Sequence, residues 1–181
     1  MDVGANYGYF SCLWVSQNSK NRAFAFEASP LNVEPLRNNV HKNNLTEQIT
    51  IIPLAVGKEK GILKFNLSNE DKQTGWGGLS IDAGSNQVDV KVCTLDEYVA
   101  EHKISNVDVL KIDTEGADTW VLYGAKKLLE NKKIANIFFE YNAERAKMLN
   151  ISPNEAKDFL ESLDYVVKQL APSEFYAYPR T

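Results

Sequence analysis

The run NVDVLKID, residues 106–113, is apolar almost throughout and decides the fold class. Near-continuous apolar runs are typical of central strands in a parallel sheet, because those strands are buried on both faces. The run that follows, TEGADTWVLYGAKKLLENK (114–132), places Trp120, Val121 and a leucine pair at helical spacing and predicts a helix. A buried strand that leads directly into a helix indicates an α/β fold.

Strands and helices alternate in the same way along the rest of the chain. Apolar and alternating patterns predict further strands at 22–28, 49–57, 61–67, 87–95, 135–142, 164–170 and 174–179. Pro53 predicts a bend or an edge position for the second of these strands. Amphipathic patterns predict helices from the opening turn to about residue 18, and at 31–44, 95–102 and 154–163. The glycine-rich, polar segment 69–86 is expected to be a loop, and no linker divides the chain, so residues 1–181 are predicted to form one domain.

Bulk composition excludes several classes of function. The 181 residues carry a formal net charge of −4, whereas a dedicated nucleic-acid-binding protein would show a basic surface. No run reaches the roughly 18 apolar residues that span a membrane, and no secretory leader pattern opens the chain. Cys12 and Cys93 stand apart as lone thiols, which favours a reducing, cytoplasmic setting. With only His41 and His102 present, a histidine-rich zinc site is excluded, and no metal site is predicted.

The chain opens MDVGANYGYF, which contains a turn bracketed by two glycines. Gly4 and Gly8 flank a predicted strand-to-helix junction and form the pattern D-x-G-x-N-x-G with Asp2 and Asn6. Glycine lets the backbone approach a ligand closely, and a helix N-terminus offers N–H groups to a carboxylate or phosphate. A tight turn without a ligand is an equal alternative.

Glu27 lies 19 residues after Gly8, at the end of the predicted strand 22–28. Doubly wound folds place an acid at this position to bind both hydroxyls of a ribose. The alternative is a solvated strand end. Together, the turn and Glu27 favour an adenosine-type ligand.

Three further carboxylates follow the two best strands. Asp113 and Glu115 come at the end of strand 106–113, and Glu140 comes at the end of strand 135–142. In an open parallel sheet this edge binds ligands, so the three side chains are expected near one pocket. The alternative for Asp113 and Glu115 is the stabilisation of a helix N-terminus, which acids favour.

These runs, in this order, resemble the FkbM-type family of S-adenosylmethionine-dependent methyltransferases. The matching runs span about residues 2–142 and are DVGANYGYFS, FEASPLNVEPLRNNVHKN, LAVG, GILKF, TLDEY, VDVLKIDTEGADTWVLYGA and IFFEYN. Asp118 stands where the family often has Glu, and Ala28-Ser29 where Glu-Pro is frequent. The resemblance implies a class I, Rossmann-like α/β fold, with a mostly parallel seven-stranded sheet, helices on both faces and an antiparallel strand at one end.

The resemblance also implies methyl transfer from S-adenosylmethionine to a hydroxyl of a sugar or polyketide-type small molecule. The turn at 2–8 then faces the methionine part of the cofactor, Glu27 binds the ribose, and Ser29 and Ala55 border the adenine. Asp113 joins the acids that favour the sulfonium cation. The implied cofactor-binding residues are Asp2, Gly4, Asn6, Gly8, Glu27, Ser29, Ala55 and Asp113.

The expected mechanism is in-line displacement at the activated methyl group, with catalysis mainly by positioning. An alcohol is a poor nucleophile near neutral pH, so a general base is expected. Asp113 or Glu115 is the first candidate for this base, and Glu140 is the third. Alternatively, Asp113 and Glu115 together hold a divalent cation that lowers the pKa of the acceptor hydroxyl.

The first strand of such a fold would begin several residues before Asp2, and here it is reduced to residues 1–3. The sequence therefore predicts a truncated first strand and self-association through the incomplete sheet. Three explanations stay open: a start that is cut short, a partner chain that completes the sheet, or a decayed copy that binds cofactor weakly. A non-catalytic α/β module is thus the alternative to an active enzyme. A nicotinamide-binding domain is a third hypothesis, which the absence of G-x-G-x-x-G disfavours.

Overall fold

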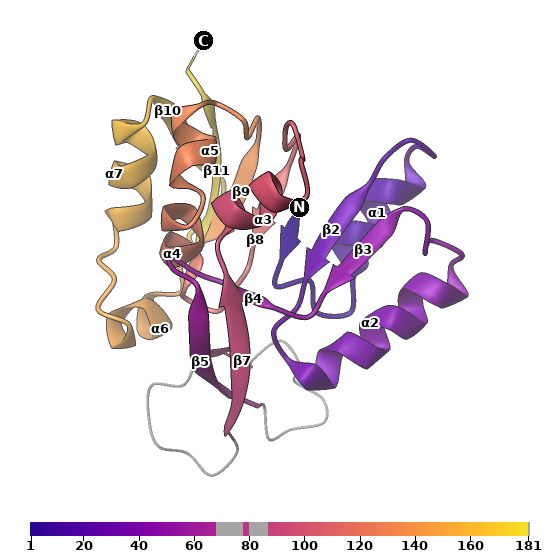
Figure 1. The fold of residues 1–181 in the computed structure, drawn as a ribbon. Coiled ribbons are helices and arrows are strands. Elements are labelled where there is room, and N and C mark those ends of the chain that lie inside the picture. The colour runs from indigo at the N-terminus through magenta and orange to yellow at the C-terminus, as the bar shows by residue number, and fades with distance from the viewer. Residues whose placement is uncertain (68–77, 80–86, 181) are drawn as a thin grey trace. The chain divides into compact units, whose positions relative to one another are not determined.

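Figure 1 presents the computed structural model, which describes residues 1–67, 78–79 and 87–180. Apart from residues 78–79, the expected loop at 69–86 lies outside the described residues. The chain divides into two compact units: unit 1 comprises residues 1–55 and 62–91, and unit 2 comprises residues 56–61 and 92–181. The expectation of one domain stays a prediction. No helix in the described ranges is long and apolar enough to cross a bilayer.

Three parallel strands form the sheet of unit 1. They lie in the order β1 (Asp2–Val3), β2 (Ala23–Phe26) and β3 (Ile49–Ile52), with Asp2 opposite Ala25 and Ala25 opposite Ile51. The parallel arrangement confirms the prediction from the alternating pattern. The first strand has only two residues, as expected, so few ladder hydrogen bonds hold the turn that follows it.

The two helices of unit 1, α1 (Tyr9–Ser16) and α2 (Pro30–Lys42), pack on one face of this sheet. Their contact residues share one hydrophobic cluster with that face, and the cluster contains Ala5, Val15, Ala23, Ala25, Leu36, Val40 and Ile49. Helix α1 forms where the sequence predicted a helix, but Phe10, Leu13 and Trp14 are exposed. Val15 and Ser11 occupy the buried stripe instead, because the Ser11 hydroxyl donates to the Asp2 carboxylate at 2.7 Å.

The predicted strand 49–57 divides into two strands at Pro53. Proline has no N–H for a ladder bond, and the Leu54 N–H closes a turn on the Ile52 carbonyl at 2.9 Å. The second part, β4 (Ala55–Val56), belongs to a different sheet with the order β4-β7-β5-β6. The other strands of that sheet are β5 (Gly61–Asn66), β6 (Gly78–Leu79) and β7 (Gln87–Cys93). The sequence predicted β5 and β7, and it missed β6.

Unit 2 contains four strands in the order β10-β11-β9-β8. They are β8 (Leu110–Ile112), β9 (Ile137–Glu140), β10 (Tyr165–Gln169) and β11 (Glu174–Pro179). Strands β8 and β9 are parallel, whereas β11 runs antiparallel to both β9 and β10. An antiparallel strand at this end of the sheet is what the family resemblance implied. Strand β8 is shorter than the predicted run 106–113, of which Val107 makes only an isolated bridge to Ile134.

The sequence predicted one continuous helix over residues 114–132, and this prediction is wrong. The segment forms two short helices, α4 (Asp118–Tyr123) and α5 (Lys126–Glu130), which are separated at Gly124. Glu115 and Gly116 have positive φ, so the helix starts only at Asp118. The Asp96 carboxylate accepts hydrogen bonds from the N–H groups of Lys127 and Leu128, which stabilises the second helix start.

Three more helices complete unit 2: α3 (Leu95–Glu101), α6 (Ala143–Met148) and α7 (Glu155–Ser162). Thr94 caps α3, since its hydroxyl accepts from the Glu97 N–H at 3.2 Å. At the start of α7, the Glu155 carboxylate accepts from the Ser152 N–H at 3.0 Å. The sequence missed α6, which is six residues long and has too few apolar positions for a period to show.

Candidate functional site

The opening turn of unit 1 is fastened to the end of β2. The N–H groups of Gly4 and Ala5 both donate to the carbonyl of Phe26, at 3.0 and 2.9 Å. Gly4, Asn6 and Gly8 all adopt positive φ, with values of 76°, 50° and 83°. A side chain at Gly8 would also collide with Leu36 on α2. The two glycines are therefore required by the backbone path itself.

Glu27 lies directly after β2 and is buried, with 5% of its surface exposed. One carboxylate oxygen accepts from the Asn6 N–H at 2.6 Å, and the other accepts from the Ser29 N–H at 2.8 Å. The Asn32 side-chain amide lies 3.4 Å from that second oxygen. Glu27 thus joins the opening turn to the start of α2. Burial raises the pKa of Glu27, and the three hydrogen bonds oppose that rise.

The hydrogen-bond acceptors of the Glu27 carboxylate fit an adenosine-type cofactor. A carboxylate has about four lone-pair positions, and the described contacts of Glu27 use three of them. An acceptor at the end of the second strand is the feature that pairs with ribose hydroxyls. Ser29 is buried beside it, and Ala55 is half-buried at the start of β4. Their contact with adenine stays a prediction.

A second group of carboxylates lies in unit 2, at the ends of β8 and β9. Asp113 forms an ion pair with Lys111 at 3.2 Å, and the Asp113 side chain is 42% exposed. Glu115 adopts a positive φ of 53° and accepts from the Asn142 amide at 3.2 Å. Glu140 ends β9. The charges of Asp113 and Glu115 both act on the Glu140 carboxyl, so the three predicted catalytic carboxylates interact electrostatically.

Burial, followed by mutual repulsion, raises the pKa of two of these acids. For Glu140, burial is the largest cause, and the charges of Asp113, Asp118 and Glu115 add to it. For Glu115, burial again comes first, followed by the charge of Asp113. A carboxylate with a raised pKa is a better proton acceptor than an ordinary surface acid. This property suits Glu140 and Glu115 to the role of general base.

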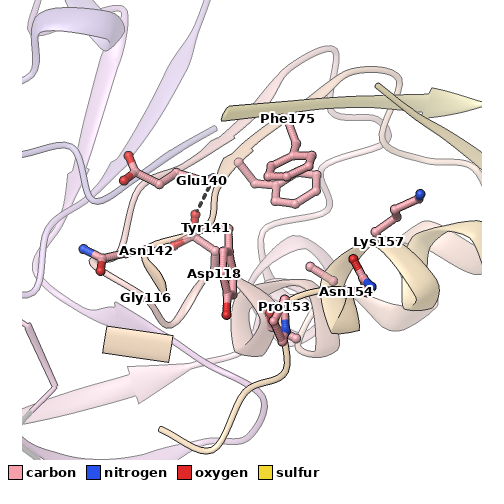
Figure 2. Close-up of a pocket in the computed structure, with 12 residues that line it drawn as sticks. Gly116, Asp118, Glu140, Tyr141, Asn142, Pro153, Asn154, Lys157 and Phe175 are labelled. Carbon is pink, nitrogen blue, oxygen red and sulfur yellow. Dashed lines mark hydrogen bonds between the residues drawn. The ribbon is translucent and has the colours of Figure 1, made fainter. Parts of the chain in front are cut away.

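Asp118 is a residue of this group that the sequence analysis did not select. It is fully enclosed, and one of its oxygens accepts from both the N–H (2.9 Å) and the hydroxyl (2.5 Å) of Thr114. Its other oxygen accepts from the N–H of Glu140 at 2.9 Å. Asp118 thus connects the segment after β8 to the end of β9, and Figure 2 shows its bond to Glu140. The sequence did contain a signal for Asp118: it is an acid between Ala117 and Thr119, on a helix face that is otherwise apolar.

Two expectations for the site remain: that Asp113 lies near the sulfonium of the cofactor, and that Asp113 and Glu115 hold a divalent cation. Asp113 belongs to unit 2, so its place beside Asp2 and Glu27 around a sulfonium stays a prediction. Within residues 1–67, 78–79 and 87–180, no group of three or more acid, histidine or cysteine side chains is arranged to hold a metal ion. A divalent cation held by Asp113 and Glu115 would therefore have no third acid, histidine or cysteine ligand in this part of the chain.

A glycine turn after the first strand, together with an acid after the second, is typical of the Rossmann-like class of α/β proteins. Within that class the chain belongs to the methyltransferase FkbM domain family, whose model matches residues 2–167. The family expected from the sequence is confirmed. The mostly parallel, Rossmann-like methyltransferase fold is confirmed as well, by similarity to solved structures.

Two curated relatives and one solved structure give the range of this similarity. The 2-O-methyltransferase NoeI of Sinorhizobium fredii is 22% identical over 93% of this chain and 73% of its own length. The hexuronic acid methyltransferase AglP of Haloferax volcanii is 27% identical over 72% of this chain and 51% of its own. The crystal structure of the FkbM methyltransferase from Methylobacillus flagellatus matches 98% of this chain and 42% of that one, with a TM-score of 0.65 and 16% identity. The chain thus spans about half the length of the last two proteins.

Proposed function

We propose that this chain is an S-adenosylmethionine-dependent methyltransferase that methylates a hydroxyl group of a sugar or similar small molecule. The observation that carries the proposal is Glu27, a buried acid at the end of β2 that also holds the opening turn. Family membership supports the reaction class. The printed names of NoeI and AglP, a 2-O-methyltransferase and a hexuronic acid methyltransferase, support a sugar hydroxyl as the acceptor.

When bound, S-adenosylmethionine supplies a methyl group on a positively charged sulfur. Glu27 would accept hydrogen bonds from the ribose, and the turn at 2–8 would lie against the methionine part. Asp2, held by Ser11, would contribute negative charge. These residues bind and orient the donor.

The acceptor hydroxyl would lose its proton to a carboxylate of unit 2 as the new oxygen–carbon bond forms and the sulfur–carbon bond breaks. Glu140 and Glu115 are suited to this step because burial and neighbouring acids raise their pKa values. Asp113 is also a candidate, and it lies in an ion pair with Lys111 at 3.2 Å. Neither Cys12 nor Cys93 forms a disulfide, which supports a reducing, cytoplasmic compartment.

Calorimetric titration with S-adenosylhomocysteine tests the donor half of this proposal. We expect saturable binding by the folded chain at one site. Mass spectrometry of p-nitrophenyl glycosides incubated with S-adenosylmethionine then tests transfer, and the expected product carries one added methyl group. Well-folded protein that neither binds S-adenosylhomocysteine nor modifies a glycoside would favour the non-catalytic alternative.

A further inference from the structure

Glu115 lies in the turn between β8 and α4, and the backbone of this turn is left-handed. Glu115 and Gly116 both adopt positive φ, with values of 53° and 98°. This conformation is unfavourable for a residue with a side chain, because its Cβ atom approaches the following carbonyl oxygen. Contacts from elsewhere in the fold are therefore needed to hold Glu115 in place.

The start of helix α6 supplies such contacts. The Nε atom of Arg145 donates to the backbone carbonyl of Glu115 at 3.4 Å. A Cβ atom added at Gly116 would lie only 2.5 Å from the Cβ atom of Arg145, so the first turn of α6 packs directly against the backbone of the 115–116 turn. From the same end of α6, the side-chain amide of Asn142 donates to the Glu115 carboxylate at 3.2 Å.

Asn142 (Figure 2) makes two hydrogen bonds of opposite sense. Its side-chain oxygen accepts from the Arg145 N–H at 3.2 Å and thereby caps α6. Its NH₂ group donates to the Glu115 carboxylate. Because the cap bond uses the amide oxygen, the NH₂ group is the part of the side chain that faces Glu115.

We infer that Asn142 is a positioning residue that orients the Glu115 carboxylate, while the cap of α6 orients Asn142 itself. Aspartate caps a helix as well as asparagine does, but it has no NH₂ group to donate. The cap alone therefore does not require asparagine, whereas the bond to Glu115 does. The role of Glu115 as a base rests on the proposed function, but its orientation by Asn142 does not.

The charged groups around Glu115 determine what the loss of this bond should do. Burial is the largest cause of the raised pKa of Glu115, and the charges of Asp113 and Asp118 add to it. The hydrogen bond from Asn142 and the charge of Arg145 oppose the rise. Removing the bond should therefore raise the pKa of Glu115 further, and a negative charge at position 142 should raise it more.

The titration of the Glu115 carboxyl, followed by ¹³C nuclear magnetic resonance of the full labelled chain, tests the inference without substrate or cofactor. Asn142→Asp keeps a capping side chain and should raise the pKa of Glu115. Asn142→Ser, whose shorter side chain also caps helices, should raise this pKa by less. In the wild type, the NH₂ signals of Asn142 should shift with the same midpoint as the Glu115 carboxyl.

Asn154→Asp is the matched control. It makes the same substitution at the N-cap of α7, where Asn154 forms no side-chain cap bond and has no described bond to Glu115. It should leave the pKa of Glu115 unchanged. The inference is overturned if Asn142→Asp leaves the Glu115 titration at the wild-type midpoint while the amide signals of α6 stay in place. Asn142→Ser gives the same comparison should aspartate disturb α6.

A kinetic measurement separates this inference from the proposed function. In methyl transfer to p-nitrophenyl glycosides, Asn142→Asp should lower kcat by about tenfold to a hundredfold, the effect of a misplaced reacting group. The affinity for S-adenosylhomocysteine should not change. An unchanged kcat together with a shifted Glu115 titration would support the orientation by Asn142 and remove Glu115 from the proposed mechanism.

Discussion

Two buried carboxylates, Glu27 and Asp118, have the same structural role in different units. Glu27 follows β2 and Asp118 begins α4, and each accepts hydrogen bonds from backbone N–H groups of two separate segments. Burying a charge is unfavourable unless it is hydrogen-bonded, and these contacts provide the compensation. In each unit, the geometry around these hydrogen bonds therefore depends on one acid.

Glu27→Gln should weaken the binding of S-adenosylhomocysteine by about tenfold or more, since a charge-assisted hydrogen bond is worth about 1.5–3 kcal/mol. The glutamine side chain keeps one acceptor oxygen, but its NH₂ group then lies against a backbone N–H that has lost its acceptor. Calorimetric titration measures the affinity, and Glu34→Gln, an exposed change on α2, is the control. Equal affinities for all three proteins would contradict the role of Glu27 in ribose binding.

Glu140→Gln should raise the midpoint of thermal unfolding near neutral pH. Burial raises the pKa of Glu140 in the folded state, with Asp113, Asp118, Glu115 and Glu174 adding to the rise. As the pH increases above about 4.3, the ordinary pKa of Glu, the unfolded chain loses this proton first. The folded state is therefore progressively destabilised until the pH passes the raised pKa.

The gain from Glu140→Gln should be absent at a pH below the ordinary pKa, where both states carry the proton. Scanning calorimetry at several pH values measures it. Glu144→Gln, an exposed change in α6, should give no gain at any pH. An increase in stability for Glu140→Gln that is independent of pH would show that electrostatic repulsion is not its cause.

At the scale of the elements, the ends of β8 and β9 are held together by Asp118. Asp118→Asn replaces one acceptor oxygen by a donor, so either Thr114 or Glu140 loses its partner. We expect a loss of about 1–3 kcal/mol in the free energy of unfolding, the cost of a buried unsatisfied group. Hydrogen exchange should become faster at the Thr114 and Glu140 amides, and Asp158→Asn on the exposed side of α7 should change neither quantity.

The joint between α4 and α5 depends on Gly124. Its Cβ position lies against the carbonyl oxygen of Gly57, so a side chain there would force the backbone apart. Gly124→Ala should cost about 1–3 kcal/mol, as overpacking of a close contact does. In Gly61→Ala nothing lies near the added methyl group, which makes it the matched control. Chemical denaturation measures both, and equal stabilities would contradict the close approach.

At the scale of the whole molecule, ligand binding to the folded state should raise its stability. S-adenosylhomocysteine at about 100 times its dissociation constant should add about 2.7 kcal/mol, whereas NADH should add nothing. Thermal shift measurements compare the two ligands. Stabilisation by NADH alone would favour the nicotinamide hypothesis. Self-association through the sheet stays a prediction, which size-exclusion chromatography with light scattering would check.

Local patterns in the sequence were enough to predict the α/β class, the parallel strands β1 to β3 and β8 to β9, and the acids at the strand ends. These features follow from the period of apolar residues and from turns whose backbone conformation requires glycine. Both can be recognised within a few neighbouring residues. The division of helix 114–132 was not predictable in this way. It depends on Gly57 and Asp96, which are distant in sequence and contact the joint only in the folded chain.

The same distinction applies to the candidate site. The sequence by itself determined the family, the opening turn and Glu27, because each is carried by residues that are close together in the chain. Only the tertiary structure decided that Asp118 holds the ends of β8 and β9, and that residues from β9 and α7 line one pocket. Hydrogen bonds and pockets between distant segments arise from packing, and no local period encodes them.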